Sequence, residues 1–138
     1  MQVPEGWRVQ SKTVARSKPK STVKKEPSVG ERVLINQLTA MKIEFTTEFK
    51  FHSQRKWRAD FRIDNYPILI EVEGGSWSGG RHTRGLGFKA DCEKYSHAAI
   101  DGWLVIRATT EQVKQGHCLI WIEECIRNID MKISKINY

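Results

Sequence analysis

Three carboxylate side chains in the middle of the chain have the types and spacing of a cation site. Glu71 and Glu73 lie two apart in the apolar run of residues 68–73, so in a strand both point to one face. Asp60 lies in the preceding alternating run, and a hairpin would bring it beside Glu71. Such charges are costly in an apolar strand unless a cation or a lysine neutralises them. Their hard oxygen atoms suit Mg²⁺ or Mn²⁺, with room for waters and a phosphate oxygen.

Two interpretations of these carboxylates are possible, and the segment that follows them helps to choose between the two. In the first, they lie on the solvent face of a sheet and pair with Arg58 or Arg62. In the second, they belong to a site for a phosphate backbone. Residues 74–87 hold six glycines together with basic and aromatic side chains, and this context favours the second interpretation.

Periodicity predicts the elements that must position these residues. A capping-box spacing at Ser28 and Glu31 begins an amphipathic helix over residues 29–41. Three strands follow, predicted over residues 43–51, 57–64 and 68–73. Their short connections make them antiparallel neighbours, and the third is apolar enough to be central.

The second half of the chain returns to helical spacing after residues 74–87, where no regular structure is expected. A helix is predicted over residues 88–100, and its buried stripe is predicted to be Phe88, Cys92, Tyr95 and Ala99. Residues 103–108 form a fourth strand. Thr109 or Thr110 caps a further helix, and Gly116 breaks it before an amphipathic segment that reaches about residue 129. The predicted order is α-β-β-β-α-β-α.

Two runs within this order carry a family resemblance. They are Trp57-Arg58-Ala59-Asp60 and Ile68-Leu69-Ile70-Glu71-Val72-Glu73-Gly74-Gly75. They resemble the PD-(D/E)xK nuclease superfamily, most closely very-short-patch repair endonucleases, related phage and bacterial endonuclease-like domains, and archaeal Holliday junction resolvases. The resemblance covers about residues 30–116, and residues 87–95 and 102–107 match that group's helix and fourth strand. It implies a restriction-endonuclease-like α/β core, α-β-β-β-α-β, with a mixed central sheet flanked by helices and a C-terminal helix.

The resemblance implies roles for the matching residues. Asp60 would be the first metal-binding carboxylate and Glu71 the second, and the backbone carbonyl of Val72 would complete the protein's share of the shell. Glu31 matches a glutamate that junction resolvases place at their metal site, and its interpretation as a capping-box residue is equally good. Ala59 stands where the motif has proline, which is a common variation.

The lysine position of the motif holds Glu73. A lysine there would orient the attacking water and stabilise negative charge on phosphorus, whereas a glutamate can act as a general base or hold a second cation. Other members move the lysine to the following helix, where Lys94 is the best candidate because it shares a face with Asp91 and His97. Lys89 is the weaker choice, and an ordinary surface pair between Asp91 and Lys94 is the alternative.

Together these residues favour a divalent-metal-dependent DNA endonuclease with Mg²⁺ or Mn²⁺ as its cofactor. A metal-activated water would attack a phosphodiester in line, with Glu73 and Lys94 positioning or deprotonating it. The expected partner is double-stranded DNA, with branched or mismatched structure as the candidate specificity, and junction or palindrome cleavage would call for a homodimer. The alternative is a nucleic-acid-binding protein that keeps the fold but has lost cleavage. An RNA substrate is a weaker third interpretation.

Seven residues are candidates for nucleic-acid contact because they are basic, or can stack on bases, near the predicted site. They are Arg55, Lys56, Arg58, Trp77, Arg81, His82 and Arg84. Trp77 would stack on or wedge between bases, as aromatic residues of very-short-patch repair enzymes do, and an equally good interpretation is an anchor of its loop on the sheet. His82 would contact a phosphate or assist the leaving group, and its more ordinary interpretation is a polar loop residue.

Positive charge is concentrated at the start of the chain. The formal net charge is +7 over 138 residues, and residues 1–30 hold seven basic and two acidic side chains. Because large aliphatic residues are scarce there, residues 1–28 are predicted to be a disordered basic arm and residues 29–138 the nuclease-like domain. The arm is either a phosphate-binding segment or a solvated tail.

Composition excludes several other classes. No apolar stretch approaches the roughly 20 residues of a membrane span, and residues 1–30 lack the apolar block of a secretory signal. We therefore expect a protein that is not secreted and is cytoplasmic, and the resemblance implies a bacterial or phage-infected cell. Cys92, Cys118 and Cys125 lack the spacing of a zinc or redox motif and are expected to be small buried side chains.

Overall fold

Eight helices and strands make up residues 25–74 and 84–136, the part of the chain that the computed structural model describes. They are α1 (Val29–Ala40), β1 (Phe45–Lys50), β2 (Arg58–Ile63), β3 (Ile68–Glu73), α2 (Arg84–Ile100), β4 (Leu104–Thr109), α3 (Thr110–Lys114) and α4 (His117–Ile136). The order is the predicted one, with the last helical region divided in two. No helix in these residues has the length and apolar composition to cross a membrane.

Local capping signals set where the helices begin. The hydroxyl oxygen of Ser28 accepts the N–H of Glu31 at 3.3 Å and so starts α1. Thr109 and Gln112 form a complete capping box at the start of α3. Gly116 then adopts a left-handed φ of 84° and separates α3 from α4, which confirms the predicted break.

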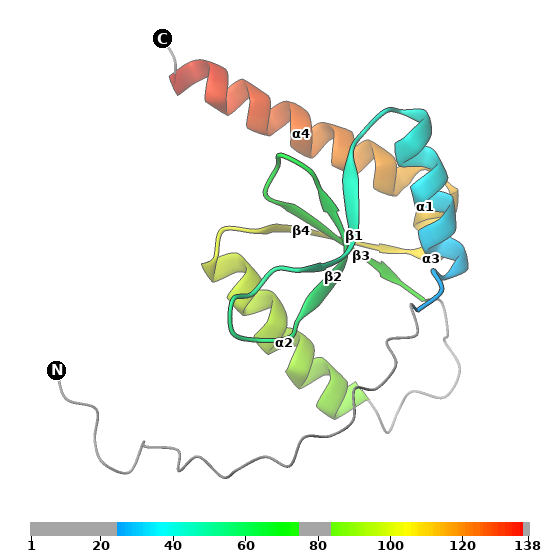
Figure 1. Ribbon diagram of the computed structural model, residues 1–138, viewed down its shortest axis with the longest axis vertical. Coiled ribbons are helices and arrows are strands. Elements are labelled where there is room, and N and C mark those ends of the chain that lie inside the picture. The colour runs from blue at the N-terminus through cyan, green and yellow to red at the C-terminus, as the bar shows by residue number, and fades with distance from the viewer. Residues whose placement is uncertain (1–24, 75–83, 137–138) are drawn as a thin grey trace, which may run out of the picture.

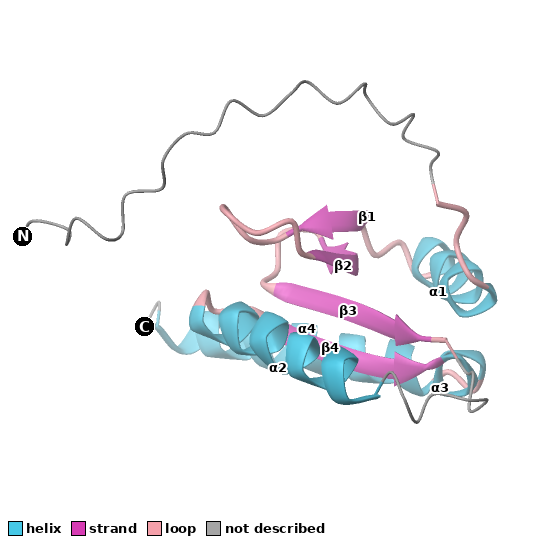
Figure 2. Cartoon of the chain, turned by 90° about the horizontal axis from the view of Figure 1, so that it is seen from below, coloured by secondary structure: helices cyan, strands magenta, loops and turns pink. Residues whose placement is uncertain are grey.

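The four strands form one mixed sheet in the order β1-β2-β3-β4 (Figure 1, Figure 2). β1 pairs with β2 and β2 with β3 in antiparallel fashion, as their short connections require. β3 and β4 run parallel, because the chain crosses between them through α2. This arrangement confirms the predicted mixed sheet, the three antiparallel neighbours and the C-terminal helix.

Helices cover both faces of this sheet, and Figure 1 shows α2 on the opposite side from α4. The main core lies under α1, α3 and α4, where Phe61 of β2 and Ile70 of β3 are fully buried. On the other face, Ala98 of α2 packs with Leu69 and Phe51. β3 is therefore covered on both faces, as predicted for a central strand, and its carboxylates lie close to buried surroundings.

Helix α2 differs from the prediction in its start and in its buried face. It begins at Arg84, so residues 84–87 are helical although irregular structure was expected there. Of the predicted buried stripe, Phe88 is 72% exposed and Cys92 and Ala99 are also exposed, whereas Ala98 is fully buried. The reason is that the face of α2 that packs on the sheet carries charged residues, and the partners of these residues lie on β3 and β4. An apolar stripe therefore does not mark its buried side.

Two smaller expectations also change. The final helix runs to Ile136 rather than to about residue 129, because helical residues continue beyond the part that packs on the sheet. Cys118 is buried and Cys125 partly buried, as expected, whereas Cys92 is exposed on α2.

Gly30 lets α1 approach the sheet closely. A Cβ at this position would lie 2.8 Å from Thr110 Oγ1 and 2.8 Å from a Val72 methyl carbon. We expect Gly30→Ala to lower the free energy of unfolding by about 1–3 kcal/mol, because these atoms must move. Gly87→Ala in α2, where the added Cβ meets open space, should instead raise it by about 1 kcal/mol. Urea unfolding of both variants measures the difference, and a stabilised Gly30→Ala variant would contradict the close packing.

Candidate active site

Three carboxylates from three elements meet at one end of the sheet. Glu31 of α1, Glu48 of β1 and Asp60 of β2 each place a carboxylate oxygen within 4.8 Å of those of the other two. Glu31 is only 8% exposed, and burial, Asp60 and Glu48 raise the pKa of its carboxyl against the opposing Ser28 hydrogen bond and Lys25 charge. We call these three residues the acid triad. Its donor set consists of hard oxygen atoms with net negative charge, and it therefore fits a divalent cation such as Mg²⁺ or Mn²⁺.

Glu48 holds its place in the triad through an unusual backbone conformation. Its φ is 50°, in the left-handed region that few side chains other than glycine adopt readily. The pairs Thr47 with Phe61 and Phe49 with Ala59 are regular, but Glu48 and Asp60 between them are not paired in the ladder. A left-handed residue of this kind costs of order 1–3 kcal/mol, and such residues cluster at functional sites.

Glu31 forms only part of the capping box that its sequence position allowed. Its backbone N–H bonds to the Ser28 hydroxyl oxygen, and its Oε1 accepts that hydroxyl's proton at 3.2 Å. The carboxylate thus lies in the acid triad rather than returning to the backbone N–H of Ser28. Only half of the predicted capping box forms, because Ser28 alone supplies the cap.

Asp60 connects the triad to strand β3. Its Oδ2 accepts the backbone N–H of Val72 at 2.8 Å, just beyond the last ladder pair between Phe61 and Ile70. The carboxylate therefore takes the place of a strand-to-strand hydrogen bond where β2 and β3 separate. The Asp60 charge also raises the pKa of Glu71, but the carboxylates that gather around Asp60 are those of Glu31 and Glu48.

Glu71 and Lys94 form a nearly buried ion pair. The Lys94 Nζ lies 2.7 Å from Glu71 Oε1, and the two side chains are 18% and 12% exposed. Burial raises the pKa of Glu71 to about 7, with the Asp60 charge adding to the shift and Lys94 opposing it. Lys94 therefore faces the carboxylates of β3, and not the surface pair with Asp91 that was the alternative.

Glu73 has a different cationic partner. Its Oε1 lies 2.7 Å from Nη2 of Arg107 and accepts the N–H of Nε at 2.9 Å. The same guanidinium lies 4.0 Å from the Asp91 carboxylate and 4.5 Å from the centre of the Tyr95 ring. Arg107 comes from β4, so neither Arg58 nor Arg62, the partners that the sequence offered, forms this pair. Arg62 instead stacks over Phe49 and Trp103.

The β1–β2 hairpin presents basic side chains beside α2. Arg55 pairs with Glu93 of α2 at 2.9 Å and lies over the Trp57 ring at 4.2 Å. Lys56 and Arg58 are exposed, and the register places Arg58 opposite Lys50, a further exposed cation. Because β1 and β2 also carry Glu48 and Asp60, the hairpin is continuous with the acid triad.

Several predicted contact residues lie outside the described residues. Trp77, Arg81 and His82 fall within residues 75–83, and most of the predicted basic arm falls within residues 1–24. Arg84 opens α2, but its side chain is also outside what the structure describes.

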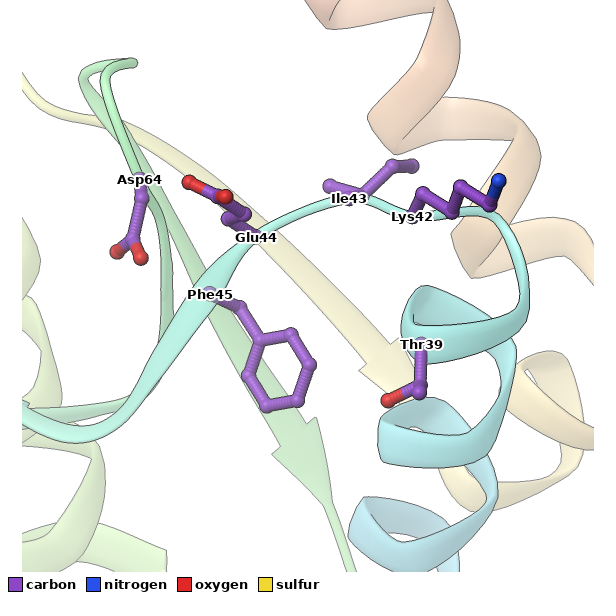
Figure 3. Close-up of a pocket in the computed structure, with 6 residues that line it drawn as sticks. All are labelled: Thr39, Lys42, Ile43, Glu44, Phe45 and Asp64. Atoms are coloured by element: carbon purple, nitrogen blue, oxygen red, sulfur yellow. The ribbon is translucent and has the colours of Figure 1, made fainter.

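A surface pocket lies apart from the acid triad, where β1 begins and β2 ends (Figure 3). It is lined by Thr39, Lys42, Ile43, Glu44, Phe45 and Asp64. It shares no residue with the triad or with the predicted site, and we assign it no role.

Comparison with known proteins identifies a similar fold. No protein-family model and no curated protein matches the sequence. Among solved structures, the fold is similar to that of the catalytic domain of the homing endonuclease I-Bth0305I. The TM-score is 0.50 at 19% sequence identity, over 79% of this chain and 93% of that one. The chain shares the fold of a nuclease catalytic domain. This confirms the predicted nuclease-like α/β core.

Two residues of the site were missed by sequence reasoning. The alternating pattern marks Glu48 only as a polar strand position, and the register of the hairpin is needed to set it opposite Asp60. Arg107 was noted only as part of the fourth strand, and its pairing with Glu73 depends on β4 lying parallel to β3.

Proposed function

We propose that this protein is a divalent-metal-dependent endonuclease that hydrolyses phosphodiester bonds in DNA. The observation that carries the proposal is the acid triad of Glu31, Glu48 and Asp60, joined through Asp60 to the Glu71 and Lys94 pair. The nuclease-like fold and the exposed basic hairpin beside the triad support it.

The proposed cation, Mg²⁺ or Mn²⁺, would be held at the acid triad by Asp60 with Glu31 and Glu48, and Glu71 and the carbonyl oxygen of Val72 would complete the protein's share of its shell. It would lower the pKa of a bound water and offset charge on the phosphate oxygens. The Val72 N–H holds the Asp60 carboxylate in place through Oδ2, and Oδ1 takes no part in that hydrogen bond. Burial of Glu31 and Glu71 keeps bulk water from competing for their oxygens.

Lys94 is proposed to replace the lysine of the motif. Its Nζ is a donor that is already directed at the carboxylates of β3, from a helix rather than from the strand itself. In this position it can orient the attacking water and stabilise negative charge on phosphorus during in-line displacement. Glu73 lies at the edge of the proposed site, where Arg107 neutralises its charge.

DNA is proposed to approach across the hairpin, where Arg55, Lys56 and Arg58 contact phosphates. Trp77, Arg81, His82 and Arg84 remain proposed contacts of the neighbouring segment. Residues 1–28 are proposed to add salt-sensitive affinity as a basic arm of the domain formed by residues 29–138. We further propose a branched or mismatched duplex as the substrate, cleavage by a homodimer, and a cytoplasmic location in a bacterial or phage-infected cell.

The hairpin contribution can be measured through the salt dependence of DNA binding. Replacing Lys50, Lys56 and Arg58 together by alanine is expected to reduce the slope of log affinity against log salt by about 2–3, since each phosphate neutralised contributes about 0.9. Fluorescence anisotropy of a labelled duplex at several salt concentrations gives the slope. Alanine at the exposed Lys42, Lys132 and Lys135 is the matched control. An equal loss of slope in both variants would mean that the hairpin has no special role.

One alternative function has an observation in its favour. The lysine position of the motif holds Glu73, which Arg107 already neutralises, as would suit a nucleic-acid-binding protein that has lost cleavage. Incubating the protein with supercoiled plasmid, a four-way junction, a mismatched duplex and an RNA duplex, with and without Mg²⁺ or Mn²⁺, separates the two. The endonuclease proposal expects metal-dependent nicking of DNA. DNA binding without nicking in either metal would support the alternative, and faster cleavage of RNA would reassign the substrate.

A further inference from the structure

The carboxylates at the acidic end of the sheet fall into two groups that differ in their cationic partners. Among residues 25–74 and 84–136 they include Glu31, Glu48, Asp60, Glu71, Glu73 and Asp91. Glu71 contacts Lys94, while Glu73 and Asp91 share Arg107. For the acid triad, the structure records no ion pair with a cationic side chain among residues 25–74 and 84–136.

Arg107 is built into its place from several sides. It donates two N–H groups toward one oxygen of Glu73, approaches Asp91 of α2 and lies over the ring of Tyr95. A guanidinium keeps its charge at all accessible pH values and presents its donors in a fixed plane. At 46% side-chain exposure it remains within reach of solvent, so ions from solution can compete for its carboxylates.

Without Arg107, this corner would resemble a cation site. Glu73 and Asp91 would then be two carboxylates without a cationic partner. Glu73 lies two residues along β3 from Glu71, and Asp91 lies less than one turn along α2 from Lys94. Hard carboxylate oxygens gathered in this way are what Mg²⁺ and Mn²⁺ bind. A fixed positive charge among them repels a divalent cation and satisfies the same oxygens.

We propose that Arg107 takes the place of a second divalent cation. Its guanidinium neutralises Glu73 and Asp91, so the acidic end of the sheet binds one divalent cation, at the acid triad, and Glu73 is not a ligand. Arg107 is thus a positioning residue that sets the cation stoichiometry of the site. The inference rests on the proposed cation binding at the triad.

Calorimetric titration with Mn²⁺ tests this directly, without reference to cleavage. The wild-type protein is expected to bind one Mn²⁺, and Arg107→Met is expected to bind two, with the second at least tenfold tighter than any residual second binding in wild type. Arg107→Lys keeps the charge and should bind one. Exchanging the pair, Glu73→Arg with Arg107→Glu, should also return the count to one. Arg127→Met, an exposed arginine on α4, is the matched control.

Each outcome of this titration decides the proposal. A count of one for Arg107→Met, with circular dichroism showing a folded protein, would overturn it, as would two ions in wild type. If Arg107→Met does not fold, the charge-exchanged pair together with Glu73→Gln decides: a second ion in the exchanged pair refutes the proposal. Wild-type protein that nicks plasmid but fails this test refutes the stoichiometry alone. Wild-type protein that neither binds Mn²⁺ nor nicks refutes the proposed function as well.

Discussion

Asp60→Asn is expected to lower metal-dependent DNA cleavage by at least about a hundredfold, because the central carboxylate of the proposed cation site loses its charge. The change leaves an oxygen that can still accept the Val72 N–H. Geometry should therefore be kept while the affinity for the cation falls. Plasmid nicking in Mg²⁺ and a calorimetric Mn²⁺ titration measure the two effects on one preparation.

The stability of this variant should move in the opposite direction. Asp60 raises the pKa of both Glu31 and Glu71, so its negative charge is unfavourable to its neighbours when no cation is bound. Without added metal, the free energy of unfolding of Asp60→Asn should equal or exceed that of the wild type. Loss of activity with gain of stability is typical of a functional residue and distinguishes it from a structural one.

Asp64→Asn is the matched control for this experiment. Asp64 follows the end of β2, accepts the Thr46 hydroxyl at 2.8 Å and lies outside the triad. Its substitution should leave cleavage and Mn²⁺ binding close to wild type. If both aspartate variants cleave equally well, the assignment of Asp60 to the site fails.

Lys94→Met is expected to lower cleavage by about 10²–10³-fold and to destabilise the protein more at high pH than at low pH. The pKa of Glu71 is raised from 4.5 to about 7 while Lys94 opposes the shift, so removing Lys94 raises it further. A carboxyl with a raised native pKa holds a proton in the folded state that the unfolded state releases. Stability then falls as pH rises above the unfolded value, by up to about 1.4 kcal/mol per pH unit, until the native pKa is passed.

The effect of Lys94→Met on stability is visible above about pH 7. In the wild type the decline due to Glu71 ends at about pH 7, whereas in Lys94→Met it continues beyond. Urea unfolding at pH 6 and pH 8.5 should therefore show the larger difference between the two proteins at the higher pH. Lys89→Met, on the exposed side of α2, should show neither the pH-dependent loss nor the loss of cleavage. A pH-independent difference would mean that Lys94 acts only through packing.

The sequence was sufficient for the order of elements and for the hairpin that carries Asp60. Alternating apolar residues and short connections fix the β2–β3 hairpin, and in the structure Asp60 accepts the N–H of Val72 on β3. The parallel β4 follows from the helix that must cross between the strands. These features depend on local patterns and on chain connectivity, and both can be inferred from the sequence alone.

The remainder of the site depends on long-range pairing that no local pattern reveals. A left-handed glutamate at position 48 has no sequence signature, because glycine or asparagine would be the expected residue there. The sequence predicts Lys94 of α2 as a residue of the site, but it does not reveal that Asp91 on the same helix approaches Arg107 of β4. A helix that buries charges against charges has the same pattern as one that exposes them.

The conformation of Glu48 also affects whether strand β1 can pair with a strand of another molecule. β1 is one of the two edge strands of the sheet, and a regular edge strand offers unpaired backbone groups that template the addition of another chain. The left-handed residue interrupts β1 in its middle, where an incoming strand would need continuous extended backbone. The left-handed conformation of Glu48 therefore opposes β-pairing with another molecule at this edge. The same conformation places the Glu48 carboxylate in the acid triad.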